Sequence, residues 1–520
     1  MVSFIRELHI QGLRKFEDLK VCFNDHMNII VGENEAGKST ILEAIKIVLY
    51  QMYRNSDKSI LRDLFNQNQV QKFKRQPSIN TLPRIEISVT LNLSTDNPRN
   101  IDFCGDNENM GIRFLCQYNP EIEPEMEGFI KDGKIPYEYY DLSWKTFSGR
   151  TYYAAKRPLV LLSIDTSLNT ATNSFNNYNR DVFTATFDEV KRMELKNKFR
   201  SNVDTLLEDE DFKIRDEARK FGIDSKKVIL ENVLSIFEND VALENKGSGM
   251  ENLIKMDIAL KKKENVNVIL IEEPENHLSY TNLRLMLDKI ESTYDSSQVI
   301  LTTHNNLIAS RLNLNNVLWI TENESKSLSD IDEDTATFFS KADNNSFLQF
   351  LLSPKCILVE GATEAMLIPM FFKDITGKSI EECNVGVISC NGISYDRYLK
   401  IAQKTSKRIA VITDNDKNED RIKKAHEFND NHGIQHIFMD NSIDNWTWEV
   451  CIFNSNELII KSLINVKKGA KYPYHNQVMD SPFLGKMLNN KAETAYQMLM
   501  SNQKFDIPQY VKDAILWLEE

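Results

Sequence analysis

The sequence predicts an α/β protein with more than one domain, and three observations support this fold class. An apolar run at Met27–Val31 leads into a glycine-containing loop and then into a helical pattern. Two further apolar runs, 266–271 and 408–412, are each followed by paired carboxylates. Continuous apolar runs of this kind are typical of strands in parallel sheets that are covered on both faces. At 520 residues, the chain has room for roughly three to four domains.

The composition excludes several classes of protein. No segment approaches the roughly 18 apolar residues of a membrane span, and Arg6 and Glu7 interrupt the first apolar run, so we expect no signal peptide. The seven cysteines are scattered and show no CxxC pair, which indicates free thiols in a reducing cytoplasm and no zinc site. The net charge of −13 argues against a non-specific nucleic-acid coat but allows a local basic channel.

Residues 32–40 have the sequence GENEAGKST and fit the phosphate-binding pattern G-x-x-x-x-G-K-[ST]. Glycines in such a loop let backbone N–H groups converge on a phosphate, and the following helix adds positive potential. We expect Lys38 to reach the outer phosphates of ATP and the Ser39 hydroxyl to hold Mg²⁺. An ordinary strand–turn–helix junction is the alternative, which the fixed residues disfavour. The predicted cofactor-binding residues of the loop are Asn34, Gly37, Lys38, Ser39 and Thr40.

Strands and polar stretches share the rest of the N-terminal half. Strands are predicted at Phe4–Ile10, at Leu19–Phe23 and at Arg84–Leu93, whose period-two alternation indicates a half-exposed antiparallel strand. The polar, Asn-rich stretch 166–180 predicts a loop or a linker. Charged helical patterns follow in 181–240, for which a solvated lid and a dimerisation arm both remain open.

A second group of residues is predicted to complete the nucleotide site. After the apolar run 266–271, Glu272 can hold a hydrated Mg²⁺ and Glu273 can orient or deprotonate an attacking water. The next apolar run ends at His304, which we expect to sense the terminal phosphate, although a lone histidine is often structural. Ser248 stands between two glycines at the start of a helix, an arrangement suited to binding an anion.

Four carboxylates form a separate cluster in the C-terminal part. Glu360 follows an apolar strand, and Glu364 comes one helical turn later. Asp414 and Asp416 follow a further apolar strand. Clustered carboxylates repel one another unless divalent cations neutralise them, and oxygen-rich sites suit Mg²⁺ or Mn²⁺. Two such ions can clamp the attacking and leaving oxygens of a phosphoryl displacement. A solvated helix face is the alternative for the two glutamates, and the neighbouring D-x-D favours metal binding.

The order of these motifs resembles the ABC-type ATPase heads of the SMC, RecF and OLD group. The similar segments are Gly32–Thr40 (Walker A), Lys246–Met250 (a degenerate signature), Leu270–Glu273 (Walker B), Asn276–Leu278 (D-loop) and His304 (switch histidine). In that family the signature serine, here Ser248, contacts nucleotide bound to the opposite head, so the resemblance implies a homodimer. The signature departs from LSGGQ, and the Walker B metal carboxylate is Glu272 instead of the usual aspartate. Candidates for the Q-loop glutamine are Gln67, Gln69 and Gln71.

The carboxylate cluster resembles a Toprim domain. Glu360 matches its lone glutamate, and Asp414 and Asp416 match its D-x-D motif. An ABC-type head followed by Toprim in one chain resembles the OLD-family nucleases, including the nuclease subunit of Gabija antiphage systems. The resemblance further implies that Glu449 supplies another metal ligand and that Lys491 stabilises the charge of the transition state. A carboxylate on a helix and a surface lysine are the alternatives for these two residues.

Together, these features predict an ABC-type ATPase head with an inserted helical dimerisation segment, followed by a Rossmann-like Toprim domain. The predicted segments are 1–165 and 241–345 for the halves of the head, 166–240 for the insertion and 346–520 for Toprim. The predicted catalytic residues are Glu360, Asp414, Asp416, Lys491 and Glu273. The predicted metal ligands are Glu360, Glu364, Asp414, Asp416, Glu449 and Ser39.

The resemblance implies an ATP-gated, Mg²⁺- or Mn²⁺-dependent DNA endonuclease with a role in antiphage defence. The expected partners are DNA, further copies of the chain in a homodimer or larger homo-oligomer, and a separately encoded defence protein, with no membrane. The basic segment 467–471 is either a DNA contact or a solvated loop. The alternative function is an SMC- or RecF-like DNA-clamping repair ATPase with a non-catalytic Toprim domain. A topoisomerase or a primase is disfavoured, because no motif for either is evident.

Overall fold

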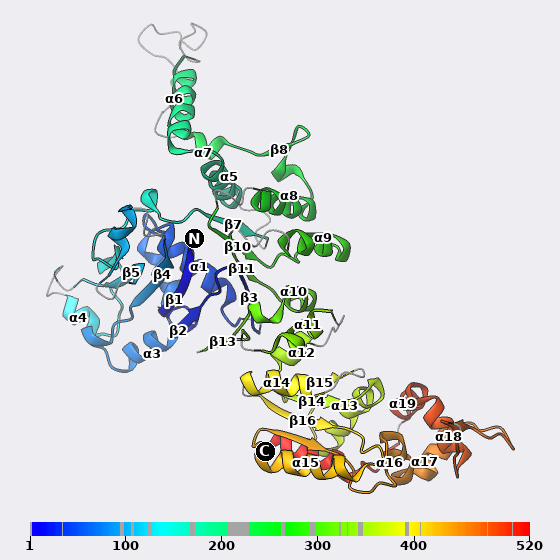
Figure 1. Cartoon of the computed structure of the whole chain (residues 1–520). Helices are drawn as coiled ribbons and strands as arrows, with labels where there is room; N and C mark the ends of the chain where they lie inside the picture. The colour runs from blue at the N-terminus through cyan, green and yellow to red at the C-terminus, as the bar shows by residue number, and fades with distance from the viewer. Residues whose placement is uncertain are drawn as a thin grey trace, which may run out of the picture. The chain divides into compact units, whose positions relative to one another are not determined.

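The computed structural model of the chain divides into two compact units, unit 1 (Met1–Ser329) and unit 2 (Asp330–Glu520) (Figure 1). The structure describes residues 3–33, 35–93, 98–105, 109–119, 121, 126–166, 172–205, 228–261, 266–291, 297–321, 324–329, 331–341, 347–390, 395–405, 407–475, 477–501 and 503–520.

Unit 1 contains an antiparallel sheet of five strands in the order β2-β1-β4-β5-β6. Its strands are β1 (Phe4–Leu13), β2 (Phe16–Cys22), β4 (Ile85–Asn92), β5 (Met110–Tyr118) and β6 (Tyr140–Thr146). Along β4, buried residues such as Ile85 and Ile87 alternate with half-buried ones. Because alternate side chains point to opposite faces of a strand, one face of the sheet lies on the core. The antiparallel strand predicted at Arg84–Leu93 is confirmed by this register.

A second sheet of six strands carries the nucleotide-binding motifs, in the order β13-β12-β3-β11-β10-β7. The strands are β3 (Met27–Val31), β7 (Leu161–Asp165), β10 (Val268–Glu272), β11 (Gln298–Thr302), β12 (Val317–Ile320) and β13 (Ser325–Ser327). All pairs are parallel except the edge pair of β12 and β13. The carboxyl ends of β3, β10 and β11 therefore meet at one edge, where ligands bind in open α/β sheets.

Helix α1 (Lys38–Leu49) lies between the two sheets of unit 1, and α8, α9 and α10 lie on the other face of the six-stranded sheet (Figure 1). Most of α1 is buried, because its apolar residues occupy more than one side of the helix. The other helices of unit 1 are α2 (Leu61–Leu64), α3 (Gln67–Arg75), α4 (Met126–Lys131), α5 (Thr172–Thr186), α6 (Glu189–Thr205), α7 (Leu230–Val233), α8 (Ser248–Lys261), α9 (Tyr280–Glu291) and α10 (Asn306–Arg311). A short β8–β9 hairpin pairs Phe237–Glu238 with Val241–Ala242.

The prediction of a loop over 166–180 is wrong, because α5 begins at Thr172 within that stretch. Tyr178 and Phe183 of this helix are buried, and the Tyr178 hydroxyl donates to the Lys255 carbonyl over 2.8 Å. The helix packs on β7. Tertiary packing therefore outweighs the weak helix propensity of its asparagines and threonines.

Unit 2 is built on a parallel sheet of four strands in the order β15-β14-β16-β17. The strands are β14 (Lys355–Val359), β15 (Val385–Ser389), β16 (Arg408–Ile412) and β17 (Gln435–Phe438). Its helices are α11 (Glu333–Lys341), α12 (Phe347–Leu352), α13 (Ala362–Thr376), α14 (Tyr395–Thr405), α15 (Glu419–Asn431), α16 (Trp448–Ser455), α17 (Glu457–Leu463), α18 (Pro482–Asn489), α19 (Lys491–Met500) and α20 (Gln509–Glu519). The two central strands pair Val359 with Ile412, so the residues that follow them leave the sheet side by side.

The structure bears on two expectations from the composition, which concern membrane-spanning segments and the state of the cysteines. Within the described ranges, no helix is both long enough and apolar enough to cross a membrane. All seven cysteines are free thiols, and four of them, Cys116, Cys356, Cys390 and Cys451, are buried. Burial raises the pKa of these four thiols to about 12, so they are protonated at neutral pH.

Candidate functional sites

The predicted phosphate-binding loop of unit 1 is closely packed at the two glycines of its motif, Gly32 and Gly37. Gly37 has a φ of +94°, and a side chain there would place its Cβ 2.4 Å from Cζ of Phe16. A Cβ on Gly32 would lie 2.8 Å from the Ile320 carbonyl oxygen. Only glycine tolerates both the backbone conformation and the space at position 37. Close packing therefore restricts the loop at its first glycine, Gly32, and at Gly37 before α1.

Lys38 places its ammonium group inside this loop. Its Nζ donates to the carbonyl oxygens of Gly32 and Glu33, both at 2.9 Å, and lies 3.4 Å from Nδ1 of His304. Burial lowers the pKa of Lys38, and the carboxylates of Glu273 and Glu275 partly oppose that shift. A buried ammonium with partners that are mostly neutral carbonyls is well suited to gaining an anionic ligand.

Ser39 and the acidic end of β10 form the next layer of this site. Burial raises the pKa of Glu272, and the nearby Ser39 side chain partly opposes that shift. Glu273 has a φ of +44°, and its Oε1 lies 2.8 Å from Nε2 of His304. His304 therefore connects Lys38 on one ring nitrogen with Glu273 on the other. The structure brings the predicted nucleotide, metal and water-activating residues together at one sheet edge.

Sequence reasoning missed two carboxylates of this edge. Glu275 accepts hydrogen bonds from the Thr303 hydroxyl at 2.7 Å and from the His304 backbone N–H at 2.8 Å, which fixes the end of β11. Asp165 ends β7 and is the register partner of Glu272. The signal for both was present in the sequence, since each acid follows a buried apolar strand.

The remaining predicted residues of unit 1 are less closely joined to the loop. Thr40 is buried in the first turn of α1, while Asn34 lies outside the described residues. Ser248 begins α8, where a Cβ on Gly249 would lie 2.4 Å from the His277 carbonyl, so the signature segment packs on the D-loop. Across the described part of unit 1, Ser248 shares no hydrogen bond with Lys38 or its partners.

The three candidate Q-loop glutamines all lie on α3. Gln69 accepts a hydrogen bond from the Arg84 backbone N–H at 2.9 Å and therefore ties α3 to the strand region. Gln67 and Gln71 are exposed. These contacts give Gln69 a structural role and leave the Q-loop glutamine unassigned.

The carboxylate site of unit 2 forms where β14 and β16 end. Glu360 follows β14, and its Oε1 accepts hydrogen bonds from the Thr413 hydroxyl and, at 3.1 Å, from the Asp414 backbone N–H. Gly361 then lets the chain turn closely past Glu364, whose Oε2 would lie 3.2 Å from a Cβ at position 361. Parallel pairing of the two strands thus brings Glu360, Glu364 and Asp414 to one place.

Asp414 is held by the segment that begins α16. Its Oδ2 accepts from the Thr447 hydroxyl at 2.6 Å, and its Oδ1 accepts from the Trp448 backbone N–H at 2.8 Å. Burial raises the pKa of Asp414 to about 7, and the Glu360, Glu449 and Glu364 carboxylates add to the shift. Burial likewise raises the pKa of Glu364 to about 7, with Glu449 and Glu360 adding to it. Closely spaced buried carboxyls of this kind favour a bound cation.

Glu449 and Lys491 form a charge pair beside Asp414. Lys491 Nζ donates to Glu449 Oε2 at 2.8 Å, and the Thr447 hydroxyl oxygen lies 3.0 Å from the same carboxylate oxygen. Glu449 is 1% exposed, so its charge is compensated inside the protein. Although burial lowers the pKa of Lys491, the Glu449 carboxylate outweighs that effect and the pKa is raised. Lys491 is therefore a stable cation at the carboxylate site.

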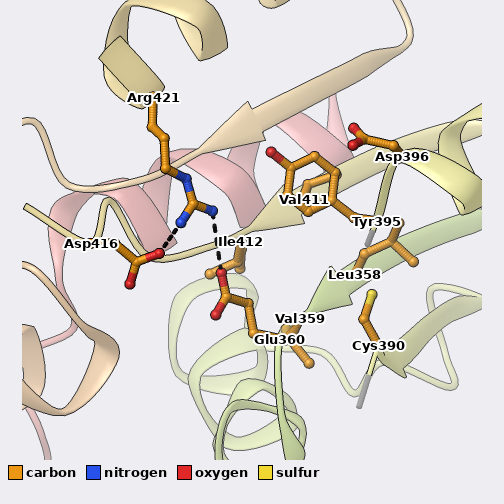
Figure 2. Close-up of a pocket in the computed structure, with 10 residues that line it drawn as sticks. All are labelled: Leu358, Val359, Glu360, Cys390, Tyr395, Asp396, Val411, Ile412, Asp416 and Arg421. Carbon is orange, nitrogen blue, oxygen red and sulfur yellow. Dashed lines mark hydrogen bonds and ion pairs between the residues drawn. The ribbon is translucent and has the colours of Figure 1, made fainter. Parts of the chain in front are cut away.

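Asp416 borders a pocket of about 440 Å³ that opens beside Glu360 (Figure 2). Asp416 has a φ of +49° and pairs with Nη1 of Arg421. The other guanidinium nitrogen, Nη2, lies 3.7 Å from Glu360 Oε1 and donates to the Thr413 hydroxyl at 3.2 Å. Arg421 thus connects two predicted metal ligands, and sequence reasoning missed it together with Thr413. An arginine near the start of a polar helix gives no distinguishing signal in a single sequence.

The donor set fits a hard divalent cation, since it consists of carboxylate oxygens only. Among the residues that the structure describes, no three Asp, Glu, His or Cys side chains are arranged as ligands of one ion. Two of the predicted ligands have cationic partners in the structure, since Asp416 pairs with Arg421 and Glu449 pairs with Lys491. A cation that binds Asp416 or Glu449 competes with these partners.

The fold and these two sites define an ATPase head joined to a Toprim domain. Comparisons with protein families agree. The AAA ATPase domain model matches residues 4–156 and 148–309, and the TOPRIM domain model of Overcoming lysogenization defect (OLD) protein-like proteins matches residues 351–416. Both occur in one chain in this order, so the chain belongs to the OLD-like family of ATPase–Toprim proteins. The predicted fold class and family are confirmed, and the family contains enzymes of the ATPase and nuclease kind.

Curated relatives match only a short segment of the chain, and solved structures match a longer part of it at low sequence identity. The DNA replication and repair protein RecF of Bacillus cytotoxicus is 38% identical over 61 residues, and that of Lactobacillus johnsonii is 39% identical over 61 residues. These matches cover 11% of this chain and 16% of each relative. The Smc head domain of Pyrococcus furiosus bound to the C-terminal domain of ScpA is 15% identical, with a TM-score of 0.36 over 63% of this chain and 97% of that chain.

Proposed function

We propose that this chain is a divalent-metal-dependent DNA endonuclease whose activity is controlled by ATP at the head. The observation that carries the proposal is the convergence of Glu360, Glu364, Asp414 and Glu449 with Lys491 at the carboxyl edge of a parallel sheet. Five carboxylates in all would hold Mg²⁺ or Mn²⁺, namely Glu360, Glu364, Asp414, Asp416 and Glu449. Bound there, such ions supply an activated water and neutralise charge on the attacked phosphate.

The protein's own groups have distinct roles in this mechanism. Lys491 stabilises negative charge on the phosphodiester as the transition state forms, because its ammonium is fixed 2.8 Å from Glu449 and faces the carboxylate site. The Thr447 hydroxyl lies 2.6 Å from Asp414 Oδ2 and 3.0 Å from Glu449 Oε2, so it bridges the two carboxylates with its one proton and limits their relative movement. The pKa values of Asp414 and Glu364 are both about 7, so these carboxyls are neutral below that pH and charged above it. When a cation binds, it displaces their protons.

At the head, Lys38 and the loop N–H groups would bind the phosphates of ATP, with Ser39 and Glu272 holding Mg²⁺. Glu273 would orient the attacking water and His304 would report the terminal phosphate, since the two side chains are in contact. We further propose a homodimer or larger homo-oligomer in which Ser248 of one copy contacts nucleotide on another. The proposed substrate is DNA, and the proposed location is the cytoplasm. The proposed role is antiphage defence together with a separately encoded partner protein.

Plasmid cleavage tests the proposal. Wild-type protein is incubated with Mg²⁺ or Mn²⁺, with and without ATP, beside Asp414→Asn and the matched surface variant Asp430→Asn, whose side chain is exposed. We expect metal-dependent cleavage in the wild type and in Asp430→Asn, and at least about a hundredfold loss in Asp414→Asn. ATP hydrolysis without cleavage in any sample would overturn the nuclease assignment and favour a DNA-clamping ATPase.

A further inference from the structure

A group of three rings and one lysine lies directly beside the carboxylate site of unit 2. We call it the aromatic platform and define it as Lys417, Trp446, Tyr474 and His475. The ring centroids of Trp446 and Tyr474 are 6.0 Å apart with 33° between their planes, and those of Tyr474 and His475 are 4.2 Å apart. Lys417 Nζ lies 4.9 Å from the centroid of the Trp446 ring. His475 is exposed, and Trp446 and Tyr474 are half-buried, so the rings are accessible in part.

The platform is joined to the carboxylate site at several points. Lys417 follows Asp416 in the chain, and the Asp416 backbone N–H donates to the Trp446 carbonyl at 3.1 Å. Trp446 precedes Thr447, whose hydroxyl holds Asp414. Tyr474 is close enough to contribute to the raised pKa of Lys491. A nucleotide that stacked on these rings would therefore place its own backbone next to the carboxylates.

The hairpin that carries Tyr474 is anchored from behind. It pairs β18 (Pro473–Tyr474) with β19 (Gln477–Val478). A Cβ on Gly485 would lie 2.1 Å from the Tyr472 carbonyl, and Asn489 Nδ2 donates to the Pro473 carbonyl at 3.0 Å. Both contacts come from α18, which packs beside α16 and α19 (Figure 1). The backbone next to Tyr474 is thus held in place without use of the tyrosine ring.

The charge around the platform suits a polyanion. Residues 458–479 contain four lysines and no acidic residue, in a chain whose net charge is −13. Lys467, Lys468 and Lys471 of this segment are exposed. Positive charge attracts the phosphates of any nucleic acid, whereas aromatic faces bind only bases that are free to unstack from a duplex. The combination of lysines with accessible rings distinguishes a single-stranded ligand from a continuous duplex.

We infer that the aromatic platform binds an unpaired nucleotide beside the phosphodiester to be cut, so that the preferred DNA carries a single-stranded segment. The inference rests on the proposed nuclease function and adds the class of its substrate. Base-on-ring stacking contributes about 1–3 kcal/mol per base and tolerates any sequence. Recognition at this surface is accordingly structural, directed at gaps, flaps or loops, and the lysines add affinity that depends on salt.

The test measures DNA binding in EDTA, where no cleavage occurs. The full chain is titrated with a labelled single strand and with the matching duplex, using wild type, Tyr474→Ala, Tyr474→Phe and the control Tyr496→Ala, a tyrosine of unit 2 that is 50% exposed. We expect tighter binding of the single strand by wild type, a loss of about five- to fiftyfold in Tyr474→Ala, and near wild-type affinity in Tyr474→Phe and Tyr496→Ala. Duplex affinity should change less than about twofold in every variant.

A spectroscopic measurement separates stacking from a structural role. A 2-aminopurine base in the single strand should be quenched on binding to wild type and to Tyr474→Phe, and remain bright with Tyr474→Ala at saturating protein. Lys467→Ala should keep the quenching. It should reduce the slope of log affinity against log salt concentration by the amount that corresponds to about one phosphate contact. Equal affinity of wild type for single strand and duplex, or equal weakening of both by Tyr474→Ala, would overturn the inference. Plasmid cleavage is assayed separately, so its failure is distinguishable from a failure here.

Discussion

The ion pair of Lys491 and Glu449 should contribute measurably to the free energy of unfolding of unit 2. The side chain of Glu449 is 2% exposed and that of Lys491 is 39% exposed. Removing one partner of a fully buried pair destabilises a protein by about 3–5 kcal/mol, because a charge is left without compensation. Water reaches the lysine end here, so we expect Lys491→Met to lower the free energy of unfolding by about 2–3 kcal/mol. For a unit of this size, that change lowers Tm by about 4–12 °C.

The chain offers a matched control for this substitution. Lys461 is also 39% exposed and pairs with Glu457 over 2.7 Å, but the Glu457 side chain is 52% exposed. Lys461→Met should therefore change stability by less than about 1 kcal/mol. The double variant Glu449→Gln with Lys491→Met should regain about half of the loss, because no unpaired charge then remains buried.

Hydrogen exchange on the full chain is the suitable assay, since two units can unfold separately. Peptides from α16 and α19 report on the ion pair, and peptides from α1 in unit 1 serve as an internal reference. We expect faster exchange in α16 and α19 of Lys491→Met, with α1 unchanged. Equal effects of Lys491→Met and Lys461→Met, or a double variant as unstable as Lys491→Met, would refute the role of Lys491 as counter-ion.

Three further predictions concern other parts of the molecule. Arg421→Gln should bind Mn²⁺ about two- to fivefold more tightly than wild type in calorimetric titration. The reason is that the partly exposed ion pairs of Arg421, which contribute up to about 1 kcal/mol, no longer compete with the metal for Asp416 and Glu360. Weaker binding by the variant would contradict this. Gly37→Ala should be about 1–3 kcal/mol less stable in urea than Gly149→Ala, since both have positive φ but only the first meets the Phe16 ring. Burial raises the pKa of Asp181 to about 6 from 3.8, so its stabilising contribution is present below pH 3.8 and lost as pH rises through 6. Asp181→Asn should accordingly gain about 3 kcal/mol over wild type in urea at pH 8 and less than about 1 kcal/mol at pH 4, and a gain independent of pH would contradict this.

The sequence predicted the elements whose signal is local. The strands before Gly32, Glu272 and Glu360 are continuous apolar runs, and burial on both faces of a parallel sheet produces such runs directly. Motif spacing then placed Glu272 and Asp414 at strand ends of their two sheets and Lys38 at the start of the helix that follows β3. The fold class and the family could be predicted for this reason.

The parts that could not be predicted depend on contacts between distant segments. Arg421 joins the carboxylate site because the chain turns through left-handed conformations at Asp416 and Lys417, and no residue type marks that turn. Thr447 holds Asp414 from a segment 33 residues away. Helix α5 forms because Tyr178 and Phe183 are buried against their surroundings, although its local sequence resembles a loop. In each case tertiary packing decides what local propensity leaves undetermined.

The two sites share a physical property that bears on how they respond to ligands. Lys38 donates to the carbonyls of Gly32 and Glu33, and Lys491 donates to Glu449, so each cation already has internal partners. A ligand that binds at either lysine replaces these internal hydrogen bonds with its own. Its affinity is therefore the difference between the free energy of the new contacts and that of the internal contacts that are lost. Small changes in the internal partners should therefore alter affinity strongly. Motifs identify the chemistry of such sites, whereas the strength of binding is set by partners such as Glu449 that only the folded chain brings together.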